Sequence, residues 1–181
     1  MKKQLIIFLL FLTALLAAEP AYLKYNQAFG MKASNIAGYG IFYGFKPLPD
    51  LRLQASGIYY LFDSELGDKR HKITNYTIGL ELQKDIVQQD NFRVYVMGGG
   101  YYYYDHDEEV DEDPFLVNNN SYNYGVGIGY EYFFRRVTLG AEIGYKLYND
   151  HLNSSRNNIE QPQELIKETK LGAGITIGFI F

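Results

Sequence analysis

Apolar and polar residues alternate along most of this chain, and the alternation is clearest in its last segment, Lys170–Phe181. One face of that segment carries Leu171, Ala173, Ile175, Ile177, Phe179 and Phe181. A period of two over this length indicates a β-strand rather than a helix. A tilted transmembrane strand needs about 9–11 residues, so the segment is long enough to cross a bilayer.

Further segments along the chain show the same alternation and predict seven more strands. They are Tyr25–Ala33, Ala37–Lys46, Leu51–Phe62, Ile73–Lys84, Phe92–Tyr104, Asn120–Phe133 and Val137–Tyr148. Together with the last segment they give eight strands. An even number of strands is typical of single-chain bacterial membrane barrels.

The predicted connections are alternately short and long after the first pair of strands. Short turns are expected at Pro47–Asp50, Val87–Asn91 and Phe134–Arg136, and long loops at Asp63–Lys72, Asp105–Asn119 and Asn149–Lys167. Outer-membrane barrels have short periplasmic turns and longer extracellular loops. Both termini are therefore expected at the periplasmic end. The first connection, near Ser34–Ile36, is short and departs from the pattern.

The position of the glycines indicates which face of each strand points outward. Most strand glycines share the polar face. Exposed to water, they would weaken the strands by about 0.5–1 kcal/mol each without a gain. Inside a narrow eight-stranded barrel, which has room only for side chains, they leave space for long charged neighbours. A soluble barrel with its apolar face inward is therefore disfavoured. The sequence predicts an all-β, eight-stranded, antiparallel up-and-down transmembrane β-barrel.

Charged residues on the polar face would then lie in the barrel interior. The set expected there as an interior charge network is Arg52, Glu81, Arg93, Glu131, Glu142 and Lys146. Opposite charges in such a place must pair or stay hydrated. We expect a structural network of salt bridges that fills the barrel, with an ion path as the alternative reading.

The aromatic residues favour the membrane interpretation. The chain has 18 Tyr and 12 Phe but no Trp, and many of them fall near strand ends. Such positions predict two aromatic girdles at the membrane interfaces. The outer girdle is expected to include Tyr39, Tyr59, Tyr76, Tyr102, Tyr104, Tyr122, Tyr124 and Tyr145, and the inner one Tyr25, Phe45, Phe92, Tyr132, Phe179 and Phe181.

The N-terminal residues 1–18 have the pattern of a secretory signal peptide. Lys2 and Lys3 precede the apolar run Leu5–Leu16, which ends in the small residues Ala17 and Ala18. The barrel domain is then expected over residues 19–181. The 17 Lys and Arg against 21 Asp and Glu give a formal net charge of −4, and loss of the two lysines would make it −6. This acidic balance argues against nucleic acid as a partner.

The expected loop Asp105–Asn119 begins with a dense run of acids. They are Asp105, Asp107, Glu108, Glu109, Asp111, Glu112 and Asp113. Hard divalent cations prefer several carboxylate oxygens, but the Gly and Glu of an EF-hand loop are missing here. A solvated, self-repelling loop is the alternative. The chain has no cysteine, and its three histidines have no metal-ligand spacing, so no cofactor or metal site is predicted.

The last strand carries a specific resemblance. Ile175, Ile177, Phe179 and Phe181 resemble the closing strand of bacterial outer-membrane barrels, in which the terminal aromatic residue serves as an assembly signal. In architecture, Tyr25–Phe181 resembles the OmpX-like and opacity-type small outer-membrane proteins of the porin family. The resemblance implies a Gram-negative outer-membrane location, contact with lipid and lipopolysaccharide, and recognition by the barrel-assembly machinery.

The same resemblance implies a non-enzymatic surface protein. Its extracellular loops would serve adhesion, contact with an unknown ligand, or envelope integrity. A narrow channel is the alternative. A less favoured alternative is a lipid A-modifying enzyme, because lipid A deacylases are also eight-stranded barrels with a late His-x-Ser pair. Here His151 and Ser154 are three positions apart, which puts that catalytic arrangement in doubt.

Overall fold

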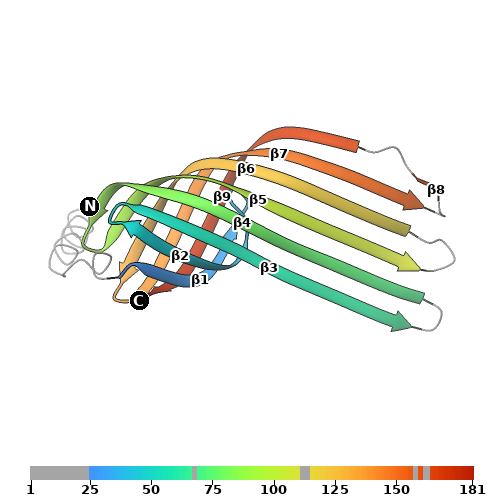
Figure 1. Ribbon diagram of the computed structural model, residues 1–181, viewed down its shortest axis with the longest axis horizontal. Coiled ribbons are helices and arrows are strands. Elements are labelled where there is room, and N and C mark those ends of the chain that lie inside the picture. Colours follow the sequence, from blue (N-terminus) through green and yellow to red (C-terminus); the bar gives the residue numbers. More distant parts are fainter. Residues whose placement is uncertain (1–24, 67–68, 111–114, 157–158, 161–163) are drawn as a thin grey trace, which may run out of the picture.

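The computed structural model describes residues 25–66, 69–110, 115–156, 159–160 and 164–181. Every element in this part of the chain is a β-strand (Figure 1). The strands are β1 (Gln27–Ser34), β2 (Gly40–Leu48), β3 (Leu51–Leu66), β4 (Lys69–Gln89), β5 (Phe92–Val110), β6 (Phe115–Phe134), β7 (Val137–Arg156), β8 (Ile159–Glu160) and β9 (Glu164–Ile180). The predicted signal peptide, residues 1–18, lies outside the described residues.

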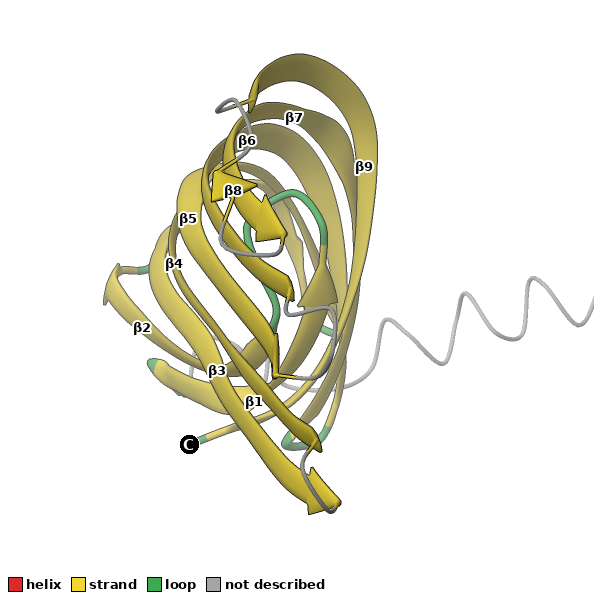
Figure 2. Cartoon of the chain, turned by 90° about the vertical axis from the view of Figure 1, so that its right-hand side faces the viewer, coloured by secondary structure: helices red, strands yellow, loops and turns green. Residues whose placement is uncertain are grey.

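Eight strands, all except the two-residue β8, close into a ring (Figure 2). Each strand from β1 to β7 pairs antiparallel with the next, β7 pairs with β9, and β9 pairs with β1. The seam between β1 and β9 runs from Ala28 opposite Ile180 to Ser34 opposite Gly174. The two-residue β8 only adds to the end of β7. The prediction of an eight-stranded, antiparallel up-and-down barrel is confirmed.

The outer wall of the ring is apolar, whereas the inner face is mainly polar. Leu80 and Ile175 on the outer wall are each 67% exposed, whereas Arg93 on the inner face is 0% exposed. A water-soluble barrel has the opposite arrangement, so this pattern fits hydrocarbon around the ring. The described residues include no helix long and apolar enough to cross a membrane.

The three long loops predicted from the sequence are wrong in extent, because most of their residues are in strands. Pairing of β3 with β4 continues to Leu66 opposite Lys69, and pairing of β5 with β6 continues to Glu109 opposite Phe115. The third segment is covered largely by β7 and β9. Beyond the membrane both faces of a strand meet water, so polar residues there mark solvent rather than the end of the strand.

The short connections lie at the end of the barrel where the C-terminus lies (Figure 1). β2 is followed by β3 after Pro49 and Asp50, and β6 by β7 after Arg135 and Arg136. Arg135 has a positive φ of 57°, which the tight reversal imposes. The prediction of short turns at this end is confirmed, with slightly longer strands than expected.

The first connection does not extend outward but folds into the ring; we call residues 35–39 the inner loop (Figure 2). A strand was predicted to start at Ala37, yet β2 begins only at Gly40. Gly38 and Gly40 have φ values of 97° and 124°, which redirect the chain in a way that L-residues rarely adopt. The Ser34 Oγ accepts a hydrogen bond of 3.1 Å from the Ile36 amide and starts the turn.

Tyrosine rings on the outer wall form a connected row around part of the ring. Tyr76 stacks on Tyr59 and Tyr104 with ring centroids 6.4 and 5.1 Å away, and Tyr102 lies 4.9 Å from Tyr122. Spacings of 4.5–7 Å are favourable for aromatic pairs. Tyr39, which was expected in this girdle, belongs instead to the inner loop, and its ring faces Tyr103 at 6.4 Å.

Candidate functional site in the barrel interior

The interior is filled in successive layers from the short-turn end. The lowest layer is apolar and consists of Ala28, Phe42, Phe133 and Ile180, all almost fully buried. Along β5, the residues Arg93, Tyr95, Met97 and Tyr101 face inward at successive levels above that layer. The order of these residues along β5 therefore gives the order of the layers in the interior.

The second layer is a buried cluster of ions around Glu131. Its carboxylate accepts hydrogen bonds from Arg52 Nη1 at 2.8 and 3.1 Å and from Arg93 Nε at 2.5 Å. Arg93 also donates through Nη1 to Asp85 at 2.6 Å, and Lys46 lies 4.0 Å from the same aspartate. Buried charges are tolerated when they are paired and hydrogen-bonded in this way.

The third layer joins one lysine to two acids. Lys32 Nζ contacts Glu81 and donates to Glu142 at 3.0 Å. Gln83 connects this layer to the second, because its amide nitrogen donates to Glu81 at 2.5 Å and its oxygen accepts from Arg93. The two layers thus form one continuous hydrogen-bonded network across the barrel.

Five of the six residues expected in the interior network take part in it. They are Arg52, Glu81, Arg93, Glu131 and Glu142. Lys146 lies in another layer, with its ammonium 3.4 Å from the Tyr148 ring centroid and 4.7 Å from that of Tyr101. Asp85 was missed because the strand was expected to end at Lys84; continued alternation past that residue was the available signal.

The inner loop covers the third layer. Ile36 and Ala37 are buried against Tyr95 and Met97. The loop also approaches glycines of the wall: a Cβ added at Gly125 would lie 2.4 Å from Ile36.

The same holds at two other wall positions. A Cβ added at Gly79 would lie 2.7 Å from the Ala37 oxygen, and one at Gly172 would lie 2.6 Å from Ile36. These glycines were expected to make room for charged side chains. They make room for the backbone and side chains of the inner loop instead.

Above the inner loop the barrel holds a cavity of about 230 Å³, which we call the cup. Its lining consists of Asn35, Tyr39, Tyr101, Tyr103, Asn119, Ser121, Asn123, Lys146 and Tyr148. Amide, hydroxyl and ammonium groups line the cup, which lies on the side of the inner loop that faces away from the short turns. Aromatic walls with a few convergent polar groups are typical of small-molecule sites.

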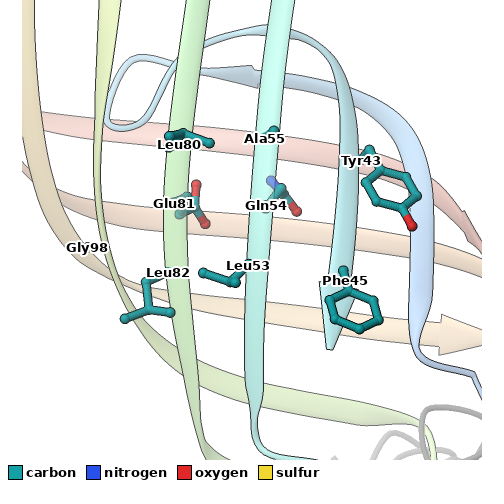
Figure 3. A pocket seen from close by; sticks show the side chains of 9 residues that line it. All are labelled: Tyr43, Phe45, Leu53, Gln54, Ala55, Leu80, Glu81, Leu82 and Gly98. Carbon is teal, nitrogen blue, oxygen red and sulfur yellow. The ribbon is translucent and has the colours of Figure 1, made fainter. Parts of the chain in front are cut away.

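Two larger hollows lie on the outer wall. One, of about 560 Å³, is formed where Ala55 and Gly98 are small among larger neighbours such as Leu53, Leu80 and Phe45 (Figure 3). The other, of about 720 Å³, lies near Met31 and Ile175. Both are lined mainly by apolar side chains of the outer wall.

The acidic segment is strand where the structure describes it, not loop. Asp105, Asp107, Glu108 and Glu109 belong to β5, while Asp111, Glu112 and Asp113 lie outside the described residues. Asp107 lies 2.9 Å from His71, and Glu108 lies 3.6 Å from His106. Within the described ranges, no three His, Cys, Asp or Glu side chains are grouped so that they could hold a metal ion. Cation binding by the full acidic run stays a prediction.

The remaining sequence-predicted residues lie on the last strands. Ile175, Ile177 and Phe179 lie on the outer face of β9, and Phe181, also exposed, follows it directly. Their role as an assembly signal stays a prediction. His151 and Ser154 belong to β7 rather than to a loop, and their side chains lie outside the described part of the structure.

The closed ring, the apolar wall and the filled polar interior define the chain as a small eight-stranded β-barrel of the outer-membrane type. No protein-family model matches the chain, and no curated protein matches it either.

Among solved structures, the chain is similar to a major outer membrane protein from Thermus thermophilus. The identity is 13% and the TM-score 0.46, over 86% of this chain and 99% of that one. It is also similar to Acinetobacter baumannii CarO, with 12% identity and a TM-score of 0.41 over 87% of this chain and 98% of that one. For Acinetobacter baumannii CarO2 the values are 13% and 0.43, over 85% and 98%. The similarity concerns the fold.

Proposed function

We propose that this protein is a non-enzymatic outer-membrane surface protein that binds an extracellular protein partner through a projecting β-sheet. The carrying observation is the unequal length of the strands. β4 has 21 residues, whereas β1 and β2 have 8 and 9. Since a crossing uses about 9–11 residues, roughly half of β4 extends beyond the membrane. At about 3.3 Å per residue this projection is about 30 Å along the strand.

The projecting sheet has two edges above the short strands β1 and β2. Pairing of β2 with β3 ends at Ile41 opposite Gly57, and pairing of β1 with β9 ends at Ser34 opposite Gly174. Beyond these points, the described residues of β3 pair only with β4, and those of β9 only with β7, apart from Ala173, which exchanges hydrogen bonds with Asn35 of the inner loop. Figure 1 shows the long strands extending past the β1–β2 hairpin.

The two edges differ in chemistry. The β3 edge has an apolar part, residues 58–62, whose five side chains are 42–64% exposed, and it continues with the exposed Asp63, Ser64 and Glu65. The β9 edge carries Lys167, Glu168, Thr169 and Lys170, all exposed. Charged residues protect an edge strand from pairing, whereas an exposed apolar edge invites it. The apolar part of the β3 edge, residues 58–62, is therefore the surface suited to a partner that adds a strand to the sheet.

An adhesion assay tests this proposal. Bacteria that display the wild-type barrel should attach to matrix-coated surfaces or host cells more than vector controls do. The double change Leu61→Lys and Phe62→Lys should abolish the gain, because lysine opposes edge pairing. Thr169→Lys on the β9 edge is the matched control and should attach like the wild type. Assembled barrel is quantified by heat-modifiable mobility in gels. Equal attachment of all variants and the vector control would overturn the proposal.

A narrow channel has less support from the geometry. The apolar layer, the ion network and the inner loop succeed one another across the interior. We therefore expect no single-channel steps in planar bilayers, and steady conductance would reverse this order of preference. For the lipid A-modifying alternative, an altered acyl pattern that depends on His151 in lipid A mass spectrometry would be the supporting result.

A further inference from the structure

The cup has features of a ligand site that the proposed surface contact does not use. Its floor includes Asn35 and Tyr39 of the inner loop, and its walls come from β5, β6 and β7. Its volume of about 230 Å³ is below the roughly 300–1,000 Å³ of drug-sized sites and suits one small molecule.

The walls of the cup are mainly tyrosine rings. Tyr39 and Tyr103 face each other with centroids 6.4 Å apart, and Tyr101 and Tyr148 both contact the Lys146 ammonium. Each ring offers an apolar face with a polar hydroxyl at its edge. A ligand here therefore meets flat apolar surfaces between hydrogen-bonding groups.

Buried amide oxygens of β6 are left without partners beside these rings. Asn123 is 2% exposed; its Nδ2 donates to Ser121 Oγ at 2.5 Å, and its Oδ1 has no hydrogen-bond partner among the described residues. The buried Oδ1 of Asn119 likewise has no hydrogen-bond partner among the described residues. Since buried polar atoms are nearly always paired in folded proteins, two acceptors lining one cavity point to a ligand that donates hydrogen bonds.

The charges around the cup exclude simple ions as the best occupant. Lys146 faces the cavity and opposes a cation. Asp105, which lies on the same face of β5 as Tyr103 and pairs with Asn119, opposes an anion. Lys170 lies 5.2 Å from the Tyr148 ring, but its charge is offset by Glu168 at 2.5 Å. A hydroxyl group both donates to the asparagine oxygens and accepts from the ammonium. We propose that the cup binds a monosaccharide or a similar uncharged polyol, with its ring packed against the tyrosines.

The test uses the refolded full-length barrel in dodecylphosphocholine micelles, a detergent without a sugar headgroup. The refolded protein is titrated with the uncharged polyols D-glucose and myo-inositol. Sodium acetate and ethanolamine serve as charged probes of similar or smaller size. NMR signals of the asparagine side-chain amides and of ¹³C-labelled tyrosine rings report on the cup. We expect saturable shifts at Asn119, Asn123 and Tyr103 with at least one of the two polyols, and none that saturates with the charged probes.

Adjacent asparagines on β6 provide matched variants. Asn119 lines the cup, whereas Asn118 accepts hydrogen bonds from Tyr104 and His106. Asn119→Ala should weaken polyol binding roughly two- to tenfold, the effect of one lost hydrogen bond, and Asn118→Ala should leave it unchanged. The inference is overturned if neither polyol gives saturable shifts, if a charged probe saturates the same signals, or if both variants bind alike. None of these outcomes depends on the β3 edge.

Discussion

Glu131 holds the lower ion cluster together, and replacing it tests whether this network stabilises the barrel. The change Glu131→Gln keeps the shape of the side chain but removes its charge. Arg52 and Arg93 then face each other across a neutral amide, which cannot accept all three of the hydrogen bonds that the carboxylate receives at 2.5–3.1 Å. Asp85 remains beside Arg93 as the nearest compensating charge.

The structure sets the expected magnitude. Glu131 is 3% exposed, and both guanidinium groups are buried, so water cannot replace the lost contacts. Removing one partner of a buried ion pair costs about 3–5 kcal/mol, because an uncompensated charge remains. The double change Arg52→Met and Glu131→Gln should recover part of this loss, since the orphaned charge is removed as well.

Urea unfolding of the refolded barrel in lipid vesicles measures these free energies, and gel mobility or circular dichroism monitors the unfolding. Glu108→Gln is the control, because Glu108 is half-exposed and contacts His106 only at 3.6 Å; a surface pair contributes about 0–1 kcal/mol. If Glu131→Gln costs no more than Glu108→Gln, or if the double-variant cycle gives no coupling, the network does not stabilise the fold and this reasoning fails.

Three further changes test other parts of the structure by the same unfolding assay and by assembly in cells. Gly125→Ala places a Cβ 2.4 Å from Ile36 and should cost about 1–3 kcal/mol, whereas Gly98→Ala, with its nearest neighbour at 3.9 Å, should cost nothing; equal effects would contradict the packing of the inner loop. Leu80→Arg on the outer wall should lower the free energy of unfolding by about 2–4 kcal/mol; a neutral result would contradict the placement of that wall against hydrocarbon. Phe181→Ala should lower the amount of assembled barrel in cells while the purified protein unfolds nearly as before; unchanged assembly would refute a terminal recognition signal.

The sequence predicted the parts of the fold that the bilayer dictates. Hydrocarbon requires an apolar residue at every second position, so Leu80 and Ile175 could be placed on the outer wall from periodicity alone. Beyond the membrane this requirement ends. The strand residues Asp105 and Asp107 therefore read as loop, although backbone pairing continues through them.

The interior could be predicted only in part, because alternation gives the face of a residue and not its partner. Lys146 shares a face with Glu142 on β7, but four residues separate them by about 13 Å along the strand, which moves the lysine to the cup. The inner loop was missed because Ala37 and Tyr39 continue the alternation of β2. Only the conformation at Gly38, visible in the structure, shows that the chain turns inward there.

The inner loop also constrains the order in which the molecule can be built. It connects β1 to β2, and β1 forms the seam with β9, so the loop belongs to the hairpin at which the two ends of the chain meet. The inner loop approaches Gly79, Gly125 and Gly172 on three separate strands, β4, β6 and β9. Once the cylinder is shut, a folded hairpin tip has no side route to that place. We therefore expect the inner loop to pack in the interior at the stage when the β1–β9 seam forms, and not before it.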